Sequence, residues 1–103
     1  MEAKVKYQSM ESAIIKVDNS EDTSAVYAMS ASVNVRKNVV ESVYGGQVKK
    51  EGNHVANFDV SASNLSLSIF GVETAERVAI MQAVQQFADD IADYVNENPI
   101  VKQ

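Results

Sequence analysis

The chain has 103 residues, of which 46% are hydrophobic and 22% are charged, a composition typical of one folded domain and unlike that of a disordered segment. It contains no cysteine, which excludes disulfide frameworks, thiolate metal sites and thiol nucleophiles. The formal net charge of -5 argues against a nucleic-acid partner unless the acidic residues lie away from the binding surface.

The N-terminal third contains two short segments in which apolar and polar residues alternate. The first covers about residues 3–8, where lysine and glutamine separate small, branched and aromatic residues. The second covers about residues 12–18 and runs into a polar loop over residues 18–22. A period of two residues is typical of half-buried strands, so we predict a strand in each segment.

The alternation continues over a longer segment in the middle of the chain. Odd-numbered positions from Ala25 to Val35 are mostly apolar and the even-numbered ones mostly polar, which predicts a strand over about residues 24–36. Residues 39–50 also have strand character, but Gly45-Gly46 interrupts them. This pair is either a two-residue hairpin turn or a bulge at which two backbones approach closely, and the pattern fits both.

Two further strands are expected before the C-terminal region. In residues 54–62, every second residue is apolar or, at position 54, histidine, and Phe58 belongs to this set; the residues between them are mostly polar. Apolar and polar residues alternate again over residues 65–70, after a turn at Ser63-Asn64. His54 falls on the apolar phase of its strand, so we expect it to be partly buried at the strand end. The segment 51–53 is rich in residues that tolerate positive φ and is expected to be a turn.

The C-terminal region predicts one long amphipathic helix over about residues 72–97. Its apolar residues recur at steps of four, three, four and three residues, namely Ile80, Val84, Phe87, Ile91 and Tyr94. This is the spacing of one face of an α-helix. Gly71 precedes the helix, and Pro99 ends it because proline disfavours the helical conformation of the preceding residue.

These elements predict a single α+β domain over residues 1–103: a meander-like antiparallel sheet of four to six strands with the C-terminal helix packed on one face. The longest expected strand and the helix would span roughly 40 Å each, whereas a compact domain of this length has a radius of gyration of about 13 Å. Either the strand bends sharply, or the subunit is elongated and shares its surface with a partner.

No catalytic, metal-binding or cofactor-binding group stands out. His54 is the only imidazole, and no serine lies in a Gly-x-Ser-x-Gly motif. Asp89, Asp93 and Glu97 share one helical face, an arrangement typical of a solvated surface, and no glycine-rich phosphate loop is present. We therefore expect no enzyme, because a catalytic function would depend on His54 alone.

The polar face of the expected sheet is the main candidate binding surface. Six of the fourteen acidic residues lie between residues 72 and 98 against one base, which leaves the rest of the chain with balanced charge. The candidate residues are Ser30, Ser32, Asn34, Arg36, Lys37, Tyr44, Lys49, Lys50, Asn57 and Phe70. This face can be a solvent face, a subunit interface, or a platform in which the basic pairs 36–37 and 49–50 form a patch and Phe70 stacks on a base.

The order of several strands followed by one helix, over roughly residues 25–95, resembles that of the dimeric single-stranded DNA-binding domains related to the positive-cofactor transcription coactivators and the whirly proteins. That resemblance implies binding through the open sheet face. Our main expectation is a non-enzymatic interaction or assembly module that forms homo-oligomers, and the alternative is a single-stranded nucleic-acid-binding protein. With no signal-peptide core and no apolar run of ~20 residues, we expect no membrane contact and a cytoplasmic protein, or a virion-internal one if the source is viral.

Overall fold

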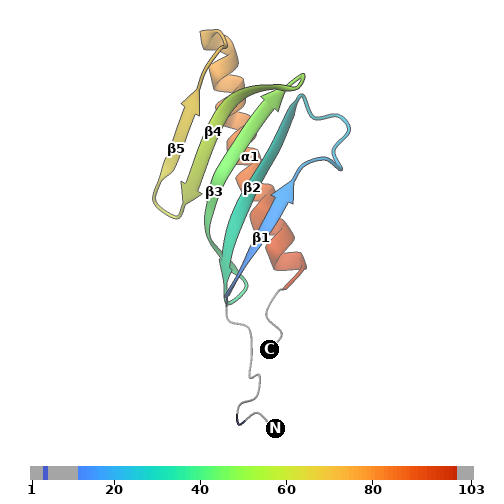
Figure 1. Ribbon diagram of the computed structural model, residues 1–103, viewed down its shortest axis with the longest axis vertical. Helices are drawn as coiled ribbons and strands as arrows, with labels where there is room; N and C mark the ends of the chain where they lie inside the picture. Colours follow the sequence, from blue (N-terminus) through green and yellow to red (C-terminus); the bar gives the residue numbers. More distant parts are fainter. Residues whose placement is uncertain (1–3, 5–11, 100–103) are drawn as a thin grey trace.

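The computed structural model describes residue 4 and residues 12–99. It contains one antiparallel sheet of five strands in the order β1-β2-β3-β4-β5, with one helix across a single face (Figure 1). The elements are β1 (Ser12–Asp18), β2 (Tyr27–Arg36), β3 (Val39–Lys50), β4 (Asn53–Ser61), β5 (Leu65–Ile69) and α1 (Thr74–Glu97). The predicted α+β meander with a C-terminal helix is confirmed, and the predicted strand over 3–8 lies outside the described residues except for Lys4.

Two tight turns connect the central strands. Lys37 and Asn38 join β2 to β3 with φ values of 51° and 63°, and Glu51 and Gly52 join β3 to β4 with φ values of 51° and 83°. Two successive residues with positive φ are the mark of the hairpin turn that matches the right-handed twist of the strands. The turn predicted over residues 51–53 is therefore confirmed, whereas the turn at Lys37 and Asn38 was not predicted from the sequence.

Strand β2 begins later than predicted, at Tyr27 rather than near residue 24. The Asp22 carboxylate accepts hydrogen bonds from the backbone N and the Oγ of Ser24, at 3.0 and 2.6 Å. Such local side-chain bonds offer the backbone an alternative to the sheet ladder. The loop thus extends into the segment whose alternation predicted a strand.

The Gly45-Gly46 pair is a bulge inside β3. Both glycines lie opposite Ala31 of β2, and Gly45 has a φ of +62°. A glycine with positive φ in the first bulge position is a known class of β-bulge. Strand β3 therefore continues through the pair, and the hairpin-turn alternative is wrong.

The hydrophobic core lies between the sheet and α1, which packs mainly on the three central strands (Figure 1). The helix buries Ile80, Val84, Phe87, Ile91 and Val95. Val95 thus takes the place predicted for Tyr94, whose side chain is 53% exposed.

α1, the helix within residues 12–99, does not combine the length and apolar character of a membrane-spanning segment.

Candidate interaction surfaces

The face of the sheet opposite α1 is not covered by any described element (Figure 1). Buried residues of β2 alternate with the residues that point to this open face. The strand pairing and the burial pattern place eight of the predicted residues there: Ser30, Ser32, Asn34, Arg36, Tyr44, Lys49, Asn57 and Phe70. Alternation alone was thus sufficient to find most of this surface.

Lys50 does not belong to the open face. Its Nζ lies 2.8 Å from Oε1 of Glu76 in the first turn of α1, and the hydroxyl of Tyr27 donates to the same oxygen at 3.5 Å. The hydrogen bond to Glu76 raises the pKa of Lys50. Burial, followed by the charge of Glu76, raises the pKa of Tyr27. Lys50 therefore connects β3 to the helix, and its predicted place in a binding patch is wrong.

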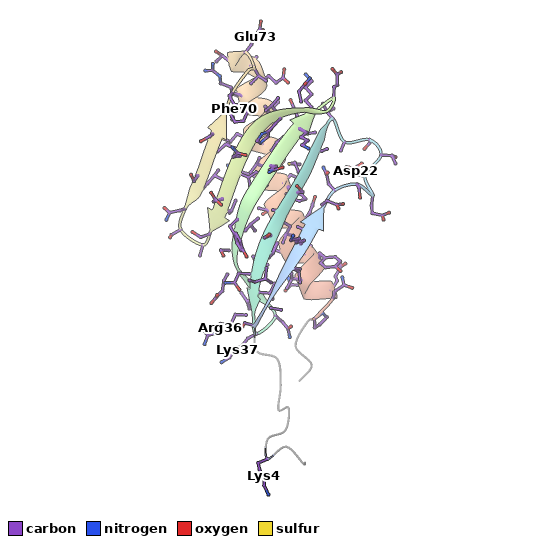
Figure 2. All side chains as sticks on the ribbon, in the orientation of Figure 1. Lys4, Asp22, Arg36, Lys37, Phe70 and Glu73 are labelled. Carbon is purple, nitrogen blue, oxygen red and sulfur yellow. The ribbon has the colours of Figure 1, made fainter. Side chains whose placement is uncertain are left out.

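The predicted basic pairs do not form one patch. Arg36 lies opposite Val39 at one end of the β2–β3 hairpin, whereas Lys49 lies opposite Ala28 near the other end. Ala28 and Arg36 are eight residue steps apart along β2, which corresponds to about 26 Å. Figure 2 shows Arg36 and Lys37 at one end of the sheet and Phe70 at the other. A ligand on the open face would meet isolated cations rather than a cluster.

His54 points to the open face and is exposed, contrary to the prediction. The pairing of β4 with β3 skips Val55, and both Val55 and Ala56 are buried. In such a bulge two successive residues share one face, which reverses the alternation before it. The reversal turns His54 outward, where its ring meets Phe70 edge-on with 5.1 Å between the ring centroids.

The imidazole of His54 is held by neighbouring oxygens. Its Nε2 lies 3.0 Å from the carbonyl oxygen of Ala56 and 2.7 Å from Oδ1 of Asn57. Both partners are oxygens that accept hydrogen bonds, so Nε2 carries the proton and donates to them. This nitrogen therefore already has hydrogen-bond partners within the protein. Among residues 12–99, no group of three or more histidines and carboxylates is placed to hold a metal ion.

The formal charges on the open face balance. Within residues 12–99, three cations and three anions point to it, namely Lys16, Arg36, Lys49, Asp18, Glu41 and Asp59. Asn34 donates to the Glu41 carboxylate at 3.5 Å, and the backbone N–H of Gly45 donates to the Asp59 carboxylate at 3.0 Å. Electrostatic attraction for a polyanion is therefore weak over this face as a whole.

A second surface, which we call the β1 groove, lies between β1 and the C-terminal half of α1. It encloses about 670 Å³. Its apolar lining comes from both elements and consists of Ile15, Val17, Phe87, Ile91 and Tyr94. Because β1 is an edge strand paired only with β2, its outer backbone groups have no strand partner among the described residues. The groove therefore combines apolar surface with an open sheet edge.

The rim of the β1 groove is acidic. Among residues 12–99, four acidic residues and one lysine line it, namely Asp18, Glu21, Asp22, Asp90 and Lys16, and the side chains of Lys16 and Asp18 lie on its open-face side. Hydrogen bonds from Ser20 lower the pKa of Asp18, and hydrogen bonds from Ser24 lower the pKa of Asp22. These two carboxyl groups therefore stay ionised at neutral pH, so the rim keeps its negative charge.

The β1 groove was not predicted from the sequence. The helical periodicity placed Tyr94 in the core, and the alternation of residues 12–18 did not show that the inner face of this strand is only half covered. The end of β1 at Asp18 and the start of α1 at Thr74 are separated by 55 residues.

Comparison with protein-family models, with curated proteins and with solved structures finds no match for this chain.

Proposed function

We propose that this protein is a non-enzymatic interaction module that associates with itself. The observation that carries this proposal is the β1 groove, where apolar side chains from strand and helix remain at the surface beside a strand edge that has no strand partner within residues 12–99. An edge of this kind is a template for another strand, because its free N–H and C=O groups can pair with a second backbone.

The burial of individual side chains supports a partner at this position. Tyr94 is 53% exposed although it lines an apolar groove, and Ile15 and Val17 are only half-buried although they belong to the inner face of β1. Burial of apolar surface contributes about 25 cal/mol per Å². A partner over the groove would therefore gain both apolar contact and backbone hydrogen bonds.

Sedimentation velocity over a wide range of protein concentration tests the proposal. We expect the weight-average sedimentation coefficient to rise with concentration as the oligomer forms. A species that stays a monomer at the highest concentration reached would contradict self-association.

Binding of single-stranded nucleic acid is the second candidate function. The observation that favours it is the presence of two exposed rings, Phe70 and Tyr44, on the uncovered face that also carries Lys49. Stacking of a base on an aromatic side chain contributes about 1–3 kcal/mol and tolerates any sequence. Since the charges of this face balance, such binding would depend mainly on stacking.

Fluorescence anisotropy with labelled oligonucleotides at low and moderate salt separates the two functions. If the open face binds single strands, Phe70→Ala and Lys49→Ala each weaken binding. Arg77→Ala, which removes one positive charge from the exposed surface of α1, has little effect and is the matched control. No binding of the unaltered protein at low salt would rule out this function.

A further inference from the structure

We propose that the β1 groove is filled by residues 3–8 of a second copy of this chain, which add to the free edge of β1 as an extra strand. The inference rests on the proposed self-association and names the segment and the site that produce it. Two copies that exchange this segment reciprocally form a closed symmetric dimer, in which each protomer gives one strand and receives one.

The alternation of residues 3–8 matches the two sides of β1. Ala3, Val5 and Tyr7 are separated by lysine and glutamine, so one face of such a strand is apolar and the other polar. Residues directly opposite each other on neighbouring strands point to the same face of a sheet. In any register that places Val5 beside Ile15 or Val17, the apolar face therefore enters the groove.

The segment and the lining of the groove carry opposite net charge. Residues 3–8 have two lysines and no acidic residue, whereas the residues that line the groove include four acids and one lysine, of which Asp18 and Lys16 lie on the open side of β1, to which Lys4 and Lys6 would point. In the antiparallel register with Val5 opposite Val17, Lys4 lies opposite Asp18 and Tyr7 lies opposite Ile15. This register also leaves one like-charged pair, Lys6 beside Lys16.

Two observations favour a second copy over the protein's own segment. Lys4 is exposed and lies beyond the end of the sheet, past Arg36 and Lys37, rather than beside β1 (Figure 2). In the register with Val5 opposite Val17, a hairpin within one chain would also place Ser12, which pairs with Arg36, in the connecting turn. A segment from a second copy needs no connecting turn in any register.

Disulfide trapping tests the contact directly, because the chain has no cysteine of its own. Full-length Val5→Cys protein is mixed with a tagged full-length Val17→Cys protein and oxidised, and the products are separated by size without reductant. We expect a disulfide-linked dimer of one tagged and one untagged chain. Ile14→Cys in place of Val17→Cys is the matched control, because Ile14 lies on the open side of the same strand, and it should yield little of that product.

A second measurement follows the association itself. Val5→Asp places a carboxylate in the apolar groove and should raise the dissociation constant of the dimer about tenfold or more. Gln8→Asp adds the same charge on the polar side of the segment and should change it far less. Far-ultraviolet circular dichroism and the melting temperature show whether each variant is folded.

Three results would overturn the inference, and they differ in what else they contradict. A chain carrying both Val5→Cys and Val17→Cys that closes a disulfide within one monomer would show that the protein's own segment occupies the groove. A dimer whose dissociation constant is unchanged by Val5→Asp would place self-association on another surface. A protein that stays monomeric at every concentration would remove both the segment exchange and the proposed self-association.

Discussion

At the scale of single residues, the position of the Phe58 ring requires a glycine at position 46. A Cβ atom at this position would lie 2.5 Å from the ring of Phe58, which real contacts do not reach. Phe58 is buried and meets Phe87 of α1 edge-on, with 6.1 Å between ring centroids, so it cannot move away freely. The glycine thus makes room for the ring that connects β4 to the helix.

Gly46→Ala should therefore lower the free energy of unfolding by about 1–3 kcal/mol, the usual cost of overpacking a core. Gly45→Asn is the matched control, because Gly45 has open space around it and asparagine tolerates positive φ. Urea unfolding of both variants measures the difference. Equal losses at the two positions would contradict the role of Phe58.

The contacts among Lys50, Glu76 and Tyr27 predict a pH dependence at the alkaline end. Folding raises the pKa of Lys50 and of Tyr27 above their ordinary values of 10.5 and 10.0. A group with a raised pKa in the folded state stabilises the protein below its unfolded pKa, and that contribution disappears as the pH rises through the folded pKa. The free energy of unfolding should therefore fall as the pH rises above about 10.

Glu76→Gln should reduce the loss of unfolding free energy at alkaline pH. It should also bring the pKa of Tyr27 closer to its ordinary value, while burial keeps that pKa partly raised. Urea unfolding at a series of alkaline pH values measures the first effect. Spectrophotometric titration of tyrosinate, with Tyr27→Phe to identify the signal, measures the second. An unchanged Tyr27 titration in Glu76→Gln would contradict the assigned contact.

At the scale of elements, the helix shows how a correct periodicity can still assign one residue wrongly. At 100° per residue, Tyr94 and Val95 lie about 50° on either side of the centre of the apolar stripe formed by Ile80, Val84, Phe87 and Ile91. The helical periodicity alone therefore predicts the same degree of burial for Tyr94 and Val95. In the fold, Val95 is 1% exposed and faces the core, whereas Tyr94 lines the β1 groove.

Val95→Ala should lower the free energy of unfolding by about 2 kcal/mol, because it removes two buried methyl groups. Tyr94→Ala should change it by less than about 0.5 kcal/mol, as is usual for an exposed position. Chemical unfolding at a protein concentration low enough to keep the chain monomeric measures both. A larger loss for Tyr94→Ala than for Val95→Ala would place Tyr94 in the core.

The bulges explain why alternation misplaced residues within otherwise correct strands. Val55 adds one residue to β4 and reverses the phase before it, so His54 points outward. A pattern of period two contains no signal for this reversal, since His54 continues the apolar phase in sequence. Gly45-Gly46 did signal an irregularity, because adjacent glycines in a strand are typical of a bulge or a turn.

At the scale of the whole molecule, the charge is distributed unequally between the two layers. The region 72–98 carries six acidic residues and one base, which accounts for the net charge of -5, while the formal charges on the open face of the sheet balance. The acidic rim of the β1 groove draws on both layers, from Asp18 in β1 to Asp90 in α1. A partner with positive charge is therefore favoured at the groove rather than at the open face.

The melting temperature should depend on protein concentration if the subunits associate. A partner that binds only the folded state stabilises it by mass action. The melting temperature should therefore rise with protein concentration, as a larger fraction of the chains is in the oligomer. Differential scanning calorimetry at low and high protein concentration measures this shift, and Val5→Asp should reduce it. A midpoint independent of concentration over the whole range would contradict association of the folded state.

The amino-acid sequence by itself determined the class of the fold and most of its elements. Period-two alternation, positive-φ turn residues and a 3.6-residue stripe depend only on local backbone geometry, so they located β1, β3, β4, β5, α1 and the open face. Only the tertiary structure decided the direction of His54, the contact of Lys50, the exposure of Tyr94 and the existence of the β1 groove. These depend on how bulges shift the strand register and on how α1 crosses a sheet wider than itself, and both are set by contacts between residues far apart in the chain.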